Sequence, residues 1–280
     1  MRRDQMPKLF EGSDPVGTLR PDLAVDWGVG ADVIVVGGAG DNAAAACGVG
    51  ALREGAAFVS LGTSGVLLAA KNSFAPMPAS AVHTFCHAIP NRWYQMGVIL
   101  AATDSLNWLA RNLEVDAAEL SNALGDRING PNQIQFLPYL SGERTPHNDS
   151  AIRGALLSID IASTRDDLTL AIMEGVSFAL RDSLEALKST GTNLSRALAI
   201  GGGSQSPYWV ELIATVLDLP IDLPEKGEFG AALGAARLAI VGHTGVDAES
   251  VMPRPKIAKT VLPRRDLTAA YDTAFDRYRK

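Results

Sequence analysis

The spacing of apolar and polar positions predicts strands and helices that follow one another along most of the chain. Short apolar or alternating runs bounded by turn residues predict strands at residues 32–36, 57–61, 66–70, 82–89, 93–98, 133–137, 197–200 and 221–223. Apolar residues at helical spacing predict helices at residues 105–113, 116–124, 166–188, 207–217, 229–241 and 266–279. This order predicts a mixed α/β fold, whereas residues 1–30 show no sustained period and are expected to be irregular.

The composition is that of a globular protein and narrows the class of function. The 280 residues are 47% hydrophobic and 20% charged, which excludes a mainly disordered chain. A net charge of −6 argues against a nucleic-acid-binding protein that must neutralise many phosphates. Two cysteines, Cys47 and Cys86, do not provide a disulfide framework, and no apolar stretch is long enough to cross a bilayer. We therefore expect a cytoplasmic protein.

Two glycine-rich segments are candidates for binding phosphate or nucleotide. Gly62, Thr63 and Ser64 lie in the turn between two apolar runs that predict a hairpin, where backbone N–H groups and hydroxyls can surround phosphate oxygens. Gly202, Gly203 and Ser204 follow an apolar strand and precede a helix, so the backbone there can approach a ligand closely. Each segment is also compatible with a plain structural turn. The sequence lacks the P-loop pattern G-x-x-x-x-G-K-[ST].

Asp41 and Asn42 are candidates for contact with a hydroxyl substrate. They follow three glycines after the strand expected at 32–36, which we expect to be buried, and begin an alanine-rich helix. A carboxylate there can act as general base for a hydroxyl nucleophile, or it can simply cap the helix. His83 and His87 are four residues apart, but in a strand that spacing is ~13 Å, too far to share a zinc ion. No metal site is predicted.

Six segments, taken in order, are similar to those of the FGGY carbohydrate kinases over roughly residues 7–242. They are Glu11–Pro21, Gly40–Ala44, Ser60–Gly65, Phe136–Asn148, Gly201–Trp209 and Gly230–Ala236. The resemblance implies the actin-like ATPase (ribonuclease-H-like) fold and, for this chain, the C-terminal lobe of a two-lobed sugar kinase that uses ATP and Mg²⁺. Residues 1–30 would then be the end of the linkage to the first lobe, 31–245 the ATP-binding domain, and 246–280 a tail with a terminal helix.

The resemblance also implies roles for individual residues. Asp41 would be the catalytic base that takes the proton of the sugar hydroxyl, with Asn42 beside it on the substrate side. The ATP phosphates would contact Gly62, Thr63 and Ser64, and the adenosine would lie against Gly202, Gly203 and Ser204. Glu143 and Arg144 would border the nucleotide side of the cleft. The chain departs from the family at Ser158, where glycine is usual, and we expect that difference to adjust a local turn.

The stretch Gly142–Asn148 most resembles the family members that phosphorylate D-xylulose to D-xylulose 5-phosphate. A sibling kinase acting on ribulose or gluconate, or an inactive nucleotide-binding remnant, are the alternatives. Family members are close to twice this length, so we expect the chain to need an N-terminal sugar-binding lobe as its partner and to be inactive as the isolated half. Many family members dimerise, which leaves a homodimer open.

Overall fold

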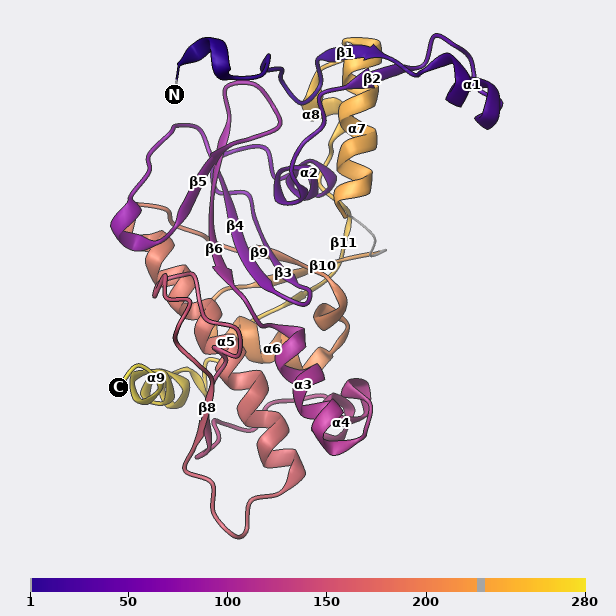
Figure 1. Ribbon diagram of the computed structural model, residues 1–280. Coiled ribbons are helices and arrows are strands. Elements are labelled where there is room, and N and C mark those ends of the chain that lie inside the picture. Colours follow the sequence, from indigo (N-terminus) through magenta and orange to yellow (C-terminus); the bar gives the residue numbers. More distant parts are fainter. Residues whose placement is uncertain (1, 226–229) are drawn as a thin grey trace.

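The computed structural model describes residues 2–225 and 230–280 of the chain (Figure 1). Within them, seven strands form the central sheet in the order β11-β10-β9-β3-β4-β6-β5. In that order the strands span Ile257–Val261, Ile221–Pro224, Ala197–Ile200, Ala57–Leu61, Gly65–Lys71, Trp93–Ile99 and His83–Cys86. The strands β10, β9 and β3 run parallel, and the outer strands pair antiparallel. The predicted hairpin is confirmed as β3 and β4, with Leu61 opposite Gly65.

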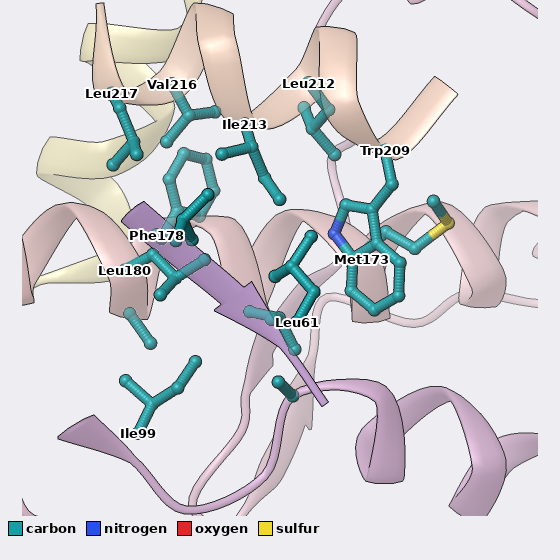
Figure 2. Packing of buried hydrophobic residues seen from close by; sticks show 14 of the residues in the cluster. Leu61, Ile99, Met173, Phe178, Leu180, Trp209, Leu212, Ile213, Val216 and Leu217 are labelled. Carbon is teal, nitrogen blue, oxygen red and sulfur yellow. The ribbon is translucent and has the colours of Figure 1, made fainter. Parts of the chain in front are cut away.

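One face of the sheet is covered by a large helical layer. It contains α3 (Thr103–Leu113), α4 (Ala117–Ala123), α5 (Arg165–Ser189), α6 (Pro207–Leu217) and α9 (Thr268–Tyr278). Figure 2 shows Leu61 and Ile99 of the sheet beneath Trp209 and Ile213 of α6. The long helix α5 begins at Thr164, which accepts a bond from Asp167 N while its own N–H donates to the Asp167 carboxylate. This reciprocal cap satisfies two polar groups that the helix leaves free.

The other face is covered by α2 (Asp41–Gly48) and α7 (Ala231–Thr244), with the short α8 (Ala248–Val251) beyond them (Figure 1). Phe58, Leu68 and Met96 point to this side and pack with the alanines of α2. The two helices approach closely: a Cβ on Gly234 would lie 1.7 Å from the Ala44 carbonyl oxygen. The helix predicted at 229–241 corresponds to α7, although Phe229 lies outside the described residues.

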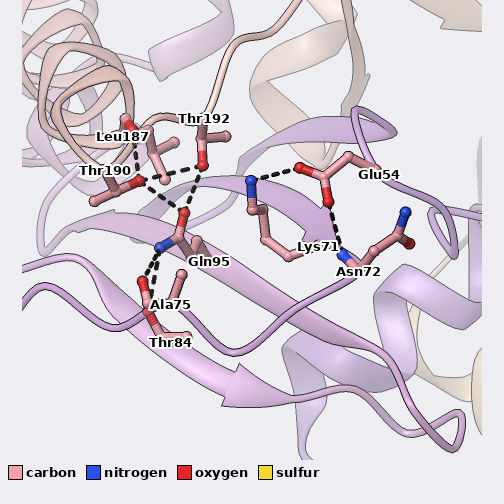
Figure 3. Close-up of polar contacts among 9 residues, drawn as sticks. All are labelled: Glu54, Lys71, Asn72, Ala75, Thr84, Gln95, Leu187, Thr190 and Thr192. Carbon is pink, nitrogen blue, oxygen red and sulfur yellow. Dashed lines mark hydrogen bonds and ion pairs between the residues drawn. The ribbon is translucent and has the colours of Figure 1, made fainter.

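Polar side chains join the sheet to the end of α5. Gln95, fully buried in β6, donates from Nε2 to the Ala75 carbonyl at 2.9 Å and accepts from Thr190 Oγ1 at 2.8 Å (Figure 3). The same figure shows Lys71 of β4 paired with Glu54. Since the Gln95 amide has partners on both sides, its burial costs little.

The N-terminal region differs from the sequence-based expectation. The first thirty residues contain β1 (Pro15–Thr18) and α1 (Pro21–Trp27), so the prediction of an irregular segment was wrong. The strand expected at 32–36 is shorter, β2 (Ile34–Val36), and it is not buried: Val35 is 42% exposed. The reason is that β2 pairs only with β1 in a ribbon outside the central sheet, where α7 covers one side of it.

The remaining predictions agree in kind but not always in length. The strand expected at 82–89 is β5, which ends at Cys86 because the chain turns before Pro90. The strand expected at 133–137 is β7 (Gln135–Leu137), which pairs with β8 (Ala155–Leu157) in a separate ribbon. Short 3-10 turns complete the described elements at Arg3–Gln5, Pro78–Ser80 and Gly202–Gln205, the last labelled η3 below.

Candidate active site

The turn between β3 and β4 is held by its carbonyl groups. The Gly62 carbonyl accepts from the backbone N–H of Thr103 at 3.0 Å and from the Thr103 hydroxyl at 2.8 Å. The Thr63 carbonyl accepts from Ala102 N at 2.8 Å. The side chains of Thr63 and Ser64 are exposed. The turn is therefore held through its carbonyl groups, and its two hydroxyls face solvent. This arrangement is compatible with phosphate binding.

The glycine segment after β9 packs directly against the end of β3. Gly201 has φ +88°, and a Cβ there would lie 2.7 Å from the Leu61 carbonyl oxygen. A Cβ on Gly203 would lie 2.9 Å from Leu61 Cβ and 3.0 Å from Thr103 Cγ2. The structure thus brings together the two glycine-rich segments that the sequence singled out. Only residues without side chains allow this approach.

The two other residues of that segment, Gly202 and Ser204, have different surroundings. No atom lies within 4 Å of a Cβ built on Gly202, so this position is open. The Ser204 hydroxyl donates to the Gly201 carbonyl at 2.6 Å, which closes the turn from within. Gly202 is therefore the position where an added side chain would enter free space, and Ser204 has a structural bond whatever else it contacts.

A cavity of about 430 Å³ lies beside Gly202 and Gly203. Its other walls come from α3, α4 and α6, with Asn107, Asn122 and Trp209 among the lining side chains. This volume is in the range of small-molecule sites. Sequence analysis did not find these wall residues, because polar side chains on amphipathic helices look the same whether they face solvent or a ligand. The only local indication of a cavity wall was the pair of small residues Ala117 and Ala118 at the start of α4.

Asp41 and Asn42 begin α2. The N-cap residue is Gly40, so Asp41 is the first helical residue and not the cap. Its Oδ1 accepts from Asn42 N at 2.7 Å and from Asn42 Nδ2 at 3.2 Å, and its side chain is exposed. Within the described part of the chain these are the hydrogen bonds of the Asp41 carboxylate, so it is not tied to the β3–β4 turn. A carboxylate in the first turn of a helix is favoured by the helix dipole.

Asp41 lies on the α2 side of the sheet, and its charge is felt by Tyr94 of β6. Burial raises the pKa of the Tyr94 hydroxyl, and the negative charge of Asp41 raises it further. Tyr94 belongs to the same packed cluster as the residues of α2. The carboxylate is thus an exposed acceptor beside the sheet, available to a hydroxyl group that approaches from solvent.

Glu143 is buried and Arg144 beside it is exposed. Burial raises the pKa of the Glu143 carboxyl to about 7, although the N–H groups of Arg144 and Leu100 oppose the rise by donating to it. Burial lowers the pKa of His83, and the positive charge of Arg144 lowers it further. The positive charge of Arg144 thus acts on His83 of β5.

The histidines do not form a metal site. His87 is buried, its Nε2 lies 3.3 Å from the Ala51 carbonyl oxygen, and its Nδ1 accepts from Ile89 N at 3.2 Å. Both ring nitrogens of His87 are therefore occupied. Among residues 2–225 and 230–280 no group of three His, Cys, Asp or Glu side chains could hold a metal ion. In the same part of the chain no helix is long and apolar enough to span a bilayer.

The mixed sheet with parallel strands at its centre and helices on both faces has the actin-like ATPase fold, and its structural neighbours are sugar kinases of that fold. The C-terminal domain of the FGGY family of carbohydrate kinases matches residues 57–243, and the N-terminal domain of that family matches residues 1–48. The chain belongs to the FGGY family of carbohydrate kinases. The predicted fold class and family resemblance are both confirmed.

Named relatives are similar over most of this chain. It is 39% identical over 282 residues to a xylulose kinase of Escherichia coli (strain K12), covering 100% of this chain and 58% of that protein. It is 42% identical over 256 residues to a xylulose kinase of Klebsiella pneumoniae, covering 90% and 52%. The crystal structure of a "xyloylose kinase" from Brucella ovis superposes with a TM-score of 0.93 at 52% identity, covering 98% and 57%. The chain spans about half the length of the curated relatives it matches.

Proposed function

We propose that this chain is the ATP-binding, base-containing part of a kinase that converts D-xylulose and ATP to D-xylulose 5-phosphate and ADP. The observation that supports a nucleotide site is the packing of Gly201 and Gly203 against Leu61, the residue before the Gly62–Ser64 turn, beside the 430 Å³ cavity. The names of the relatives support the choice of sugar. In the reaction, the sugar 5-hydroxyl oxygen forms a bond to the γ-phosphorus, the bond to the ADP oxygen breaks, and the hydroxyl proton passes to a carboxylate.

Each part of the site has a role in this proposal. Asp41 accepts the proton of the hydroxyl, and Asn42 donates a hydrogen bond to the sugar. Gly62, Thr63 and Ser64 bind phosphate oxygens through backbone N–H groups and hydroxyls. Gly202, Gly203 and Ser204 form the wall against which the adenosine lies. Phosphoryl transfer depends mostly on positioning and on stabilising charge, so a well-fixed turn contributes directly to the rate.

Magnesium enters the proposal as part of the nucleotide substrate. Mg²⁺ in kinases is usually held by one or two carboxylates together with the substrate phosphates and water. The described residues hold no cluster of three ligating side chains that would bind the ion by themselves. We therefore assign no residue of this chain as a dedicated Mg²⁺ ligand and expect the ion to bind as Mg–ATP.

We further propose that turnover requires the rest of the family's N-terminal domain. The curated relatives contain this part in addition to the half that matches this chain. In this scheme residues 31–245 are the ATP-binding lobe, and the sugar is bound mainly by the other lobe. The C-terminal family model, which matches residues 57–243, supports the larger part of the ATP-binding lobe, whereas the N-terminal family model matches residues 1–48 and so includes Asp41. The chain alone should then bind nucleotide and release no ADP with xylulose, and addition of the complementary lobe should restore xylulose-dependent ADP release.

Calorimetric titration of the chain with ADP and Mg²⁺ tests the nucleotide site. A Cβ on Gly202 meets no atom within 4 Å, so Gly202→Val should extend into the cavity, leave the fold intact and weaken ADP binding by at least tenfold. Gly17→Val is the matched control, since a Cβ on Gly17 also meets no atom within 4 Å and the residue lies in the N-terminal ribbon. Equal ADP affinity of the folded Gly202→Val chain and the wild type would contradict the assigned site.

The substrate is tested separately in the complete kinase. ADP release is measured with D-xylulose, ribulose and gluconate as acceptors. A kcat/KM for D-xylulose well above those for the other two supports the proposal. A preference for ribulose or gluconate would keep the kinase assignment and replace the substrate.

A further inference from the structure

The site described so far leaves the burial of Glu143 unexplained. Its side chain is 2% exposed, and its Oε1 accepts from Leu100 N at 3.0 Å and from Arg144 N at 2.8 Å. Its other oxygen, Oε2, is buried and has no hydrogen-bond partner among the described residues. A carboxyl group in this state lowers stability compared with an apolar side chain that would fill the same space. Its presence therefore calls for a role other than stabilisation.

The bond from Leu100 connects Glu143 to the segment that holds the phosphate turn. Leu100 follows β6 directly, and two residues later Ala102 N donates to the Thr63 carbonyl at 2.8 Å. Next, Thr103 donates twice to the Gly62 carbonyl, through its N–H and its hydroxyl. Glu143 is thus at one end of a short path of contacts, and the turn that we assign to phosphate binding is at the other.

The loop that contains Glu143 is itself fixed to the sheet. Thr145 N donates to the Val98 carbonyl at 3.1 Å, and Val98 N donates to Thr145 Oγ1 at 3.1 Å. These bonds use the edge of β6 where β5 has ended, since β5 pairs with β6 only as far as Met96. Glu143 and Asp149 also exchange backbone bonds of 2.8 and 2.9 Å. The loop is therefore attached to β6 by backbone and side-chain hydrogen bonds, and from it the Glu143 carboxylate reaches the Leu100 N–H.

We propose that Glu143 is a positioning residue for the phosphate turn: by fixing the Leu100 N–H it sets the segment 100–103, which in turn holds Gly62 and Thr63. The inference rests on the proposed nucleotide site. It differs from a general stabilising role because it predicts an effect on the phosphates of the nucleotide and none on the adenosine. The adenosine cavity is formed by η3, α3, α4 and α6, and Glu143 is not among its lining residues.

The test compares ADP and adenosine binding by the chain in calorimetric titrations. Glu143→Leu removes the acceptor and keeps an apolar side chain of similar size. It should weaken ADP binding by about tenfold, which is the loss of about 1.4 kcal/mol, and leave adenosine affinity unchanged. Glu143→Gln keeps an oxygen that can accept from both N–H groups and should retain ADP affinity within about twofold.

Glu174→Leu is the matched control. Glu174 is also a buried glutamate whose carboxylate accepts a backbone N–H, that of Asn132 at 3.0 Å, but it lies on α5 away from the turn. Its replacement should change stability without changing the ratio of ADP to adenosine affinity. Equal loss of both ligands in a folded Glu143→Leu chain, or no loss of either, overturns the positioning role.

A variant at the far end of the path keeps the proposal testable if Glu143→Leu does not fold. Thr103 also lines the adenosine cavity, but Thr103→Val removes only the hydroxyl bond to Gly62 and keeps the methyl group that faces Gly203, so it too should weaken ADP more than adenosine. An unchanged ratio in the folded Thr103→Val chain overturns the inference. Failure of the wild-type chain to bind either ligand would instead overturn the nucleotide site of the proposed function, and the inference with it.

Discussion

Ser60 in β3 and Ile200 in β9 are register partners in the parallel part of the sheet. Parallel strands in register end at the same edge, so the chain leaves both strands at neighbouring points and enters a glycine turn in each case. Leu61 then lies beneath Gly201 and Gly203. The pairing of these two strands brings close together two segments that are far apart in the sequence and that we propose to form one nucleotide site.

Replacing Asp41 by Asn should abolish catalysis and spare nucleotide binding. The amide cannot accept the proton of the sugar hydroxyl, and the loss of a general base lowers rates by about 10²- to 10⁴-fold. The kcat of the complete kinase measures the loss. ADP affinity of this chain should stay within twofold, since the Asp41 side chain bonds only to Asn42 in the described structure. Full turnover by Asp41→Asn would remove this residue from the role of base.

Replacing Ser158 by Gly should stabilise the chain. Ser158 has φ +64°, a left-handed conformation that costs a residue with a side chain about 1–2 kcal/mol. Glycine removes this strain but has more freedom in the unfolded chain, so we expect a net gain of about 0.5–1 kcal/mol in the free energy of unfolding. Urea denaturation measures it. Ser195→Gly, at an exposed position without a positive φ, should instead lower stability, and the same sign for both variants would contradict the argument.

The free energy of unfolding should fall as the pH rises from about 5 to about 8. Burial raises the pKa of Glu174 to about 8 and that of Glu143 to about 7. The folded chain therefore holds protons on these groups that the unfolded chain, with ordinary carboxyl pKa values, has already released. Stability from the protonated forms is complete below the unfolded pKa and is lost as the pH passes the folded values.

Urea midpoints measured across this pH range test the expectation. Glu174→Gln, which is neutral at every pH, should flatten the upper part of the profile and leave the part due to Glu143 and to Asp182, whose pKa burial raises to about 6. A profile of the wild type that does not change between pH 5 and 8 would show that the two carboxyl groups are not protonated in the folded chain.

Replacing Gly234 by Ala should separate α2 from α7. The new methyl group would lie 1.7 Å from the Ala44 carbonyl oxygen, so the helices must move apart, at a cost of about 1–3 kcal/mol or more. Thermal unfolding measures the loss. Ala236→Ser, at an exposed position on the same helix, should cost less than about 0.5 kcal/mol. Equal stability of Gly234→Ala and the wild type would contradict the close packing.

Most of the fold could be predicted from the sequence because local patterns determine it. The hairpin at 57–70 follows from two apolar runs around Gly62–Gly65, and α5 follows from a long apolar stripe behind acidic residues. The strand order could not be predicted, since it depends on which distant runs pair. The exposure of Val35 was missed for a related reason: its β-branched run looks like a buried strand, and only the pairing partner decides where it lies.

The two glycine-rich turns of the candidate site could be predicted from the sequence, but the side chains that line the cavity could not. Glycines at Gly201 and Gly203 signal close backbone contact, and the structure supplies that contact at Leu61. Thr103 gave no such signal, because a threonine at the start of a helix is common whether or not its hydroxyl holds a distant turn. The buried state of Glu143 was also hidden, since a polar loop of this composition predicts exposure.

The contact of Gly234 with Ala44 has a mechanical consequence. Because the backbones of α2 and α7 touch at this point, a shift of one helix along or away from the other must move its neighbour. Asp41 is the first residue of α2. Gly242 lies near the end of α7, where it packs against the Ser13 carbonyl. A displacement of the N-terminal ribbon would therefore reach the Asp41 carboxylate through α7 and α2.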